Sequence, residues 1–158
     1  MQIAELSSQP HRLDDAVNYF WGCWGNTSNF DFYRDCIAHS LQPENLLPKF
    51  YLALENNSII GSYALLVNDL VSRQDLMPWL ACLHVNESHR NRGIATALLE
   101  HGLQEAGRKN FNHLYLSTDL VGFYEKRGWR VFGTVYNLFG EAFQVYAHAT
   151  PANTEISL

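Results

Sequence analysis

Residues 88–102, with the sequence SHRNRGIATALLEHG, are the strongest candidate for a site that does chemistry. Arg90, Arg92 and Gly93 open the stretch, which then becomes apolar at helical spacing with no acid in the predicted first turn. Free N–H groups and the helix dipole make a helix N-terminus positive, so Asp or Glu usually gathers there. Glu87 is the only acid nearby in the sequence. We therefore expect an external anion to supply the missing negative charge.

The composition of this stretch suits a diphosphate. Gly93 removes a side chain at the turn and Ala95 keeps the next exposed position small, so a ligand can lie against backbone N–H groups. The guanidinium groups of Arg90 and Arg92 can bind phosphate oxygens in a fork. The alternative is an ordinary surface turn with solvated arginines, because so short a pattern recurs by chance. The stretch is neither a P-loop nor a dinucleotide-binding GxGxxG motif.

Composition and charge limit the class of protein. The chain has 158 residues, of which 47% are hydrophobic and 17% charged, as is typical of one globular domain with its own core. The net charge of −5 disfavours nucleic acid as a partner and favours cationic ligands. No apolar run is long enough to span a membrane and no signal peptide is visible, so we expect a cytoplasmic protein without a membrane partner.

The cysteines do not indicate a disulfide framework or a zinc site. They are odd in number and lack CxxC spacing: Cys23, Cys36 and Cys82. A reducing compartment fits this usage, and we expect no metal.

Periodicity and turn residues predict a mixed α+β fold in a single domain over residues 1–150, followed by a frayed tail over residues 151–158. The expected strands are 2–6, 49–55, 59–67, 79–85, 113–118, 129–138 and 142–149. The expected helices are 12–24, 30–41, a long helix after Gly93 and a short one over 121–128, capped by Asp119. Residues 56–58 form a tight hairpin. The unit over 79–118 is expected to be a parallel strand–helix–strand crossover within a mostly antiparallel central sheet flanked by helices.

At this point the sequence resembles the GNAT superfamily of acyl-CoA-dependent N-acetyltransferases. Residues 90–95, RNRGIA, are similar to its R/Q-x-x-G-x-G/A motif, and YLSTDLVGFYEKRGW is similar to its second signature. The predicted order of elements also matches along nearly the whole chain. The two motifs are specific as a pair and much less so singly, and together they imply a GNAT-like fold.

The resemblance implies acetyl-CoA as the acyl donor. Its diphosphate is expected on the amides from about Asn91 to Thr96, and its pantetheine arm along the backbone of Leu83 to Val85. Ser117 either bonds this arm or merely ends its strand. The implied contacts to acetyl-CoA are Leu83, Val85, Arg90, Asn91, Arg92, Gly93, Ile94, Ala95, Thr96, Ser117 and Tyr124.

The implied reaction is direct attack of a primary amine on the thioester. The backbone N–H of Val85 is expected to stabilise the developing oxyanion. Tyr124, the tyrosine of FYEKRGW, is expected to give a proton or hydrogen bond to the leaving thiolate. Without the family resemblance, a core aromatic role for Tyr124 is the simpler interpretation.

The base that removes the amine proton is not evident. Some relatives carry a Glu or His on the central strand at the positions of Trp79 and Ala81. Strand alternation places Cys82 and His84 on the opposite side, as packing residues. Asp69, Asp75 or a chain of water molecules stays open as the base.

Aromatic side chains are expected to wall the acceptor pocket, with core packing as the alternative for each of them. The expected acceptor contacts are Trp21, Trp24, Phe30, Tyr33 and Trp79. The leading hypothesis is that the protein acetylates a small cationic amine. A peptide N-terminus or protein lysine, and a non-catalytic acyl-CoA-binding module, are the alternatives. A homodimer also stays open.

Overall fold

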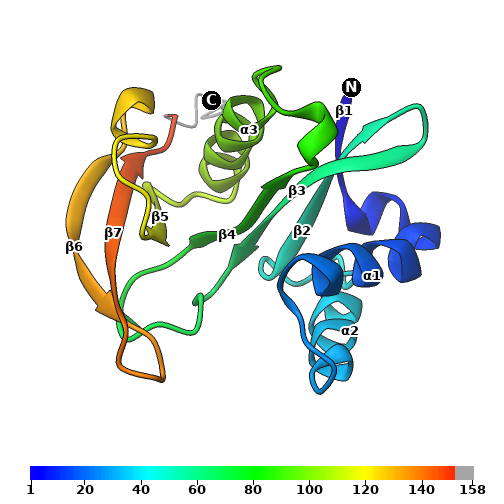
Figure 1. Ribbon diagram of the computed structural model, residues 1–158, viewed down its shortest axis with the longest axis horizontal. Coiled ribbons are helices and arrows are strands. Elements are labelled where there is room, and N and C mark those ends of the chain that lie inside the picture. Colours follow the sequence, from blue (N-terminus) through cyan, green and yellow to red (C-terminus); the bar gives the residue numbers. More distant parts are fainter. Residues whose placement is uncertain (152–158) are drawn as a thin grey trace, which may run out of the picture. The chain divides into compact units, whose positions relative to one another are not determined.

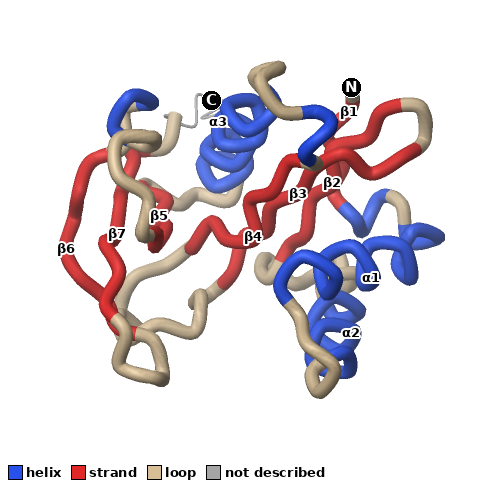
Figure 2. Tube along the Cα trace, viewed as in Figure 1, coloured by secondary structure: helices blue, strands red, loops and turns tan. Residues whose placement is uncertain are grey.

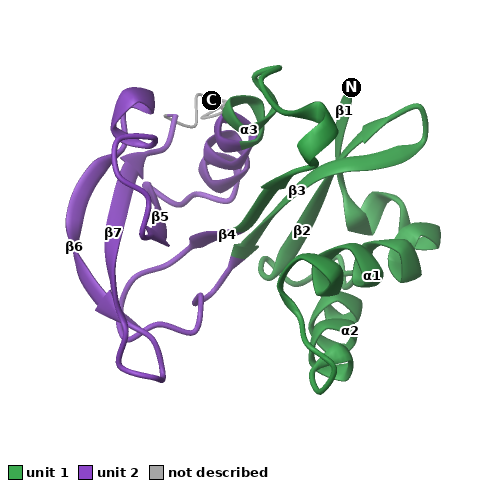
Figure 3. Cartoon of the chain, viewed as in Figure 1, with its two compact units in different colours: residues 1–65, 82–98 green, residues 66–81, 99–158 purple. Residues whose placement is uncertain are grey.

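The computed structural model describes residues 1–151, so the predicted tail lies outside the described residues except for Pro151. These residues form two compact units (Figure 3). The first contains Met1–Leu65 and Cys82–Leu98. The second contains Leu66–Ala81 and the described residues from Leu99 on.

Seven strands are hydrogen-bonded in the order β1-β2-β3-β4-β5-β7-β6 (Figures 1 and 2). Their bounds are β1 Gln2–Glu5, β2 Lys49–Glu55, β3 Ser58–Leu66, β4 Trp79–Val85, β5 His113–Thr118, β6 Arg130–Tyr136 and β7 Ala142–Ala149. β4 and β5 pair in parallel, whereas β1/β2, β2/β3, β5/β7 and β6/β7 pair antiparallel. β4 begins in the second unit and ends in the first. The predicted fold class, mostly antiparallel with one parallel pair, is confirmed.

Two helices, α1 (Leu13–Trp24) and α2 (Phe30–His39), pack in the first unit. The fully buried Phe20 of α1 meets Phe50 of β2 edge-to-face, with ring centroids 5.0 Å apart. Between the strands, Tyr51 and Tyr63 stack as a cross-strand pair with centroids 4.4 Å apart. The contact between Phe20 and Phe50 holds α1 against the sheet of the first unit.

The predicted tight hairpin joins β2 to β3. Its two turn residues, Asn56 and Asn57, have φ values of 49° and 66°. Positive φ at both central positions is the type I′ geometry that asparagine tolerates and that matches strand twist. The turn leaves Glu55 at the end of β2.

The second unit is built on β5, β7 and β6, with β7 between the other two. A buried cluster of Val71, Trp79, Val135 and Val145 forms part of its core. Helix α3 (Ile94–Arg108) begins in the first unit and continues in the second.

The short helix predicted over residues 121–128 is wrong. Only a single 3₁₀ turn, Glu125–Arg127, is present. Gly122 and Gly128 both have positive φ, at 89° and 84°, so the left-handed residues on either side leave room for one turn. Asp119 therefore caps no helix, and the Leu120 N–H donates instead to the Thr118 hydroxyl at 3.0 Å.

None of the helices within residues 1–151 is long and apolar enough to cross a membrane.

Candidate functional site

The turn before α3 is exposed and sharply bent. A 3₁₀ turn, Glu87–His89, leads into it, and Asn91 and Gly93 have φ values of 62° and 75°. The Ala97 N–H donates to the Gly93 carbonyl at 3.0 Å, so the helical hydrogen bonds begin at this glycine. Helix geometry leaves first-turn amides without intrahelical partners, and no acid lies in the first turn of α3. This helix start, which we call the corner, therefore has the features that favour an anion.

The charge of Arg92 is compensated within the chain, contrary to our expectation. Its guanidinium bonds the Glu55 carboxylate in a fork, with N···O distances of 2.7 and 3.1 Å. His89 Nε2 lies 3.5 Å from the same carboxylate. The hydrogen bond from Arg92 lowers the pKa of Glu55. The counter-ion lies 37 positions before Arg92 in the chain, so only the hairpin between β2 and β3 brings it there.

Arg90 is hydrogen-bonded to the end of β4. Its Nε donates to the Val85 carbonyl at 3.2 Å. The guanidinium thus ties the turn to the strand along which we expect the pantetheine arm to lie. Leu83 and Val85 are both half-buried.

Asn86 joins three elements at the start of the turn. Its backbone N–H donates to Ile60 at 2.9 Å, and its side-chain amide donates to Ile59 at 3.0 Å. Its Oδ1 accepts from the hydroxyl of Tyr19 on α1 at 2.6 Å. The end of β4, the start of β3 and helix α1 are therefore fixed to one another.

Strand alternation does not hold along β4, so it does not decide where His84 points. Cys82 has a φ of 54°, outside the extended region, and its carbonyl accepts from Ser62 Oγ at 3.0 Å. The imidazole of His84 lies against α1, with ring centroids 6.0 Å from Tyr19 and 5.9 Å from Trp24.

His84 lies beside Trp24, one of the predicted acceptor aromatics, and sequence reasoning missed it as a functional candidate. Burial, and secondarily the charge of Arg90, lowers its pKa. The ring is therefore neutral at neutral pH and able to accept a proton. Nothing in the sequence reveals this arrangement, because a cysteine is not a residue that signals positive φ.

The predicted acceptor aromatics of α1 and α2 form two small groups. Trp24 stacks on Phe20 at 6.1 Å and remains 40% exposed beside His84. Trp21 meets Phe30 edge-to-face at 5.3 Å and donates its indole N–H to the Asn26 carbonyl at 2.8 Å.

Tyr33 and Trp79 have different surroundings. The half-buried Tyr33 packs edge-to-face on Phe32 at 5.8 Å. Trp79 is fully buried in the second unit and donates its indole N–H to Leu76 at 2.7 Å. Of the five predicted acceptor contacts, Trp24 lies beside His84. Trp79 is instead part of the core of the second unit.

In the second unit, Tyr124 belongs to an aromatic group. It is 7% exposed, and its ring lies near Phe123, Trp129 and Tyr146, with centroids 4.9, 6.2 and 5.6 Å away. Burial raises the pKa of Tyr124. Ser117 is half-buried on β5, opposite Val145 of β7.

Asp69 and Asp75, the two acids that remain candidates for the base, both lie in the second unit, and their pKa values are shifted in opposite directions. A forked ion pair with Arg73, with both N···O distances 2.8 Å, lowers the pKa of Asp75 to about 2. Burial raises the pKa of Asp69 to about 6. Asp69 is therefore the better proton acceptor of the two near neutral pH. Within residues 1–151, no group of three or more His, Cys, Asp or Glu side chains is arranged to hold a metal ion.

Comparison with known sequences identifies one family. The profile of the Acetyltransferase (GNAT) family matches residues 13–129. No curated protein sequence matches the chain.

Solved structures share the fold. An aminoglycoside 6′-N-acetyltransferase from Enterococcus faecium is 18% identical over 98% of this chain and 100% of its own, with a TM-score of 0.70. An aminoglycoside 6′-acetyltransferase type Ii is 22% identical over 94% and 97%, with a TM-score of 0.68. A GNAT family acetyltransferase from Elizabethkingia anophelis, solved with acetyl-CoA bound, is 23% identical over 65% and 76%, with a TM-score of 0.54.

Proposed function

The chain belongs to the GNAT family of acyl-CoA-dependent N-acetyltransferases, and we propose that it moves the acetyl group of acetyl-CoA to the primary amine of a small cationic molecule. The observation that carries the proposal is the start of α3, where Gly93, with a φ of 75°, opens the first-turn amides to an exposed corner. Such a corner suits the diphosphate of the donor. The relative from Elizabethkingia anophelis, solved with acetyl-CoA bound, agrees with this choice of donor.

In the proposed reaction the amine nitrogen attacks the thioester carbonyl directly. A C–N bond forms, the C–S bond breaks, the amine proton passes to a base and CoA leaves as a thiolate. The Val85 N–H is our assignment for the donor to the oxyanion. The bond from Arg90 to the Val85 carbonyl supports it, because it restrains the peptide that follows Val85 and so the end of β4.

We assign the base to His84. An alkylammonium with a pKa near 10.4 is mostly protonated at neutral pH, so a proton must leave before attack. A neutral imidazole is suited to take it. The position of His84 beside the half-exposed Trp24 supports the assignment, because the indole face can hold the ammonium group by a cation–π contact before it is deprotonated.

The acceptor class rests on charge and on the aromatics of α1 and α2. The net charge of −5 favours encounter with cations, although salt screens this effect. Asp31 and Asp35 lie on α2 among the aromatic residues, and both are exposed. The aminoglycoside acetyltransferases among the structural neighbours point to the same kind of polycationic acceptor.

We expect free polyamines or aminoglycosides to be acetylated faster than peptides. The check is thiol release from acetyl-CoA with each acceptor at matched concentration and modest ionic strength. Peptides faster than every small amine by about tenfold, roughly 1.4 kcal/mol of transition-state stabilisation, would overturn the acceptor class and leave the acetyltransferase intact. No release with any acceptor, while acetyl-CoA still binds, would favour a binding module.

Tyr124→Phe is expected to lower kcat about tenfold and to leave the Kd for acetyl-CoA nearly unchanged, because a thiolate partner matters mainly as the C–S bond breaks. The loss should lie below the hundredfold or more typical of acid–base catalysis, because burial raises the pKa of this phenol and makes it a weaker acid. Single-turnover kinetics and calorimetry separate the two quantities. Tyr146→Phe is the control. Its ring centroid lies 5.6 Å from that of Tyr124, and the change removes a hydroxyl that bonds Glu125 and Gln144, so this variant should keep its kcat. A change in kcat within about twofold for Tyr124→Phe would remove Tyr124 from the mechanism.

A further inference from the structure

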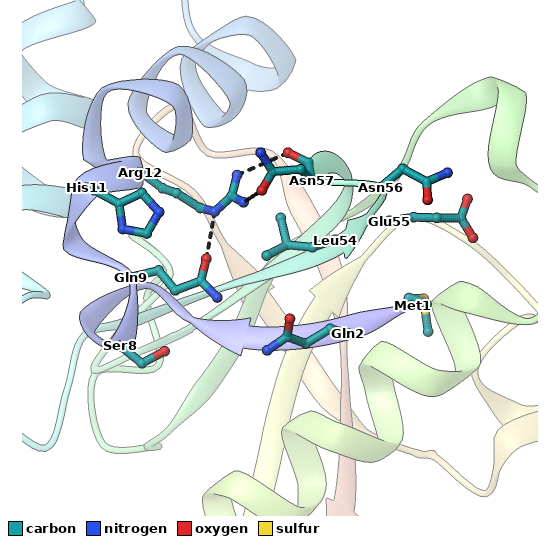
Figure 4. A pocket seen from close by; sticks show the side chains of 10 residues that line it. All are labelled: Met1, Gln2, Ser8, Gln9, His11, Arg12, Leu54, Glu55, Asn56 and Asn57. Atoms are coloured by element: carbon teal, nitrogen blue, oxygen red, sulfur yellow. Dashed lines mark hydrogen bonds between the residues drawn. The ribbon is translucent and has the colours of Figure 1, made fainter.

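Glu55 stands between the hairpin of the first unit and the turn before α3. It ends β2 and lies at the rim of a polar cavity of about 860 Å³ that Arg12, Asn56 and Asn57 also line (Figure 4). Its side chain is 26% exposed. No role in the acetyl transfer proposed above requires an acid at this position.

The basic side chains near Glu55 differ in whether they pair with it. Arg12 does not pair with it: its guanidinium donates to Gln9 and twice to Asn57, as Figure 4 shows. Glu55 instead pairs with Arg92 and lies within reach of His89. Both partners belong to the turn before α3, so the one carboxylate contacts side chains on either side of Arg90.

We propose that Glu55 is an internal counter-ion of the diphosphate site, which Arg92 exchanges for the donor diphosphate when acetyl-CoA binds. This inference rests on the proposed function, since it requires CoA to bind at the turn. In the free protein the carboxylate occupies the Arg92 fork and places a negative charge beside the anion site. Competition from the Glu55 carboxylate lowers the affinity for both acetyl-CoA and the product CoA, and it therefore favours product release.

The exchange is favourable because the broken pair is weak and the new one is strong. Arg92 is 47% exposed in the pair, and ion pairs with that much solvent access stabilise a protein little. A diphosphate offers more charge and more acceptor oxygens to the same guanidinium fork. Removing the competing carboxylate should therefore tighten CoA binding, and more strongly at low salt than at high salt.

The test is the affinity for CoA, measured by calorimetry on the full chain at fixed pH and ionic strength. Glu55→Gln keeps the shape and removes the charge, and we expect CoA to bind roughly fivefold more tightly. Glu87→Gln is the matched control: it makes the same change in net charge within the same turn, and no ion pair of Glu87 is present within residues 1–151. It should alter the affinity by less than about twofold.

A double-mutant cycle separates exchange from a structural role. In an Arg92→Gln background, Glu55→Gln should lose most of its effect, because no guanidinium remains to be released. Weaker CoA binding by Glu55→Gln, or by Glu55→Ala as the second variant, would mean that the pair anchors the turn and would overturn the inference. Equal effects of Glu55→Gln and Glu87→Gln would overturn it too. Failure of the wild-type chain to bind CoA would instead contradict the proposed function.

Discussion

Gly93→Glu is expected to abolish acetyl-CoA binding in a protein that still folds. A Cβ at this glycine meets no atom within 4 Å, so the new side chain has room in the free protein. The carboxylate then occupies the corner where we place the diphosphate and repels it. Two like charges about 4 Å apart near a protein surface cost on the order of 4 kcal/mol, so a loss of at least about 100-fold in affinity follows.

Two variants separate charge at the corner from backbone strain. Gly93→Ala carries the same strain, because its φ of 75° is unfavourable for any L-residue, but adds no charge. It should weaken binding far less. Gly140→Glu adds the same side chain at another exposed glycine, with a φ of 79° and open space around its Cβ, and should bind normally. Calorimetry that gives folded Gly93→Glu the wild-type affinity would rule out this turn as the diphosphate site.

The sequence predicted those parts of the fold that local chemistry determines. Asn56 and Asn57 specify a two-residue hairpin because asparagine tolerates positive φ at both turn positions. The start of α3 was predictable for the same reason, since a glycine corner followed by an apolar stripe is a local signal. The antiparallel pairing of β6 with β7 was also predictable, whereas the position of β7 between β5 and β6 depends on long-range pairing.

The features that could not be predicted depend on contacts between residues far apart in the sequence or on unusual backbone dihedral angles. The partner of Arg92 is Glu55, which no local window contains, so the turn looked uncompensated. The two-residue period of a strand predicts a packing role for His84, and positive φ at Cys82 interrupts that period. A positive φ has no sequence signal when the residue is not glycine, asparagine or aspartate. Local backbone features were therefore easier to predict from the sequence than contacts between distant residues.

His84→Gln is expected to lower kcat about 100-fold at neutral pH while the Kd for acetyl-CoA stays unchanged, because the lost group acts on the amine and not on the donor. The wild-type pH profile carries the sharper signature. The rings of Tyr19 and Trp24 from α1 lie against the imidazole, and burial and the charge of Arg90 lower its pKa. Activity requires the neutral ring, so kcat should rise with pH through this lowered pKa and level off above it. The variant should lose that rise.

Two further variants make the assignment specific. His101→Gln removes another half-buried histidine whose pKa burial also lowers, and it should keep both the rate and the pH-dependent rise. Asp69→Asn tests the main competitor, because burial raises the pKa of Asp69 to about 6 and its ionised form would give a similar rise in rate with pH. If the rise disappears in Asp69→Asn and persists in His84→Gln, Asp69 is the base, and the position of His84 beside Trp24 reflects packing alone.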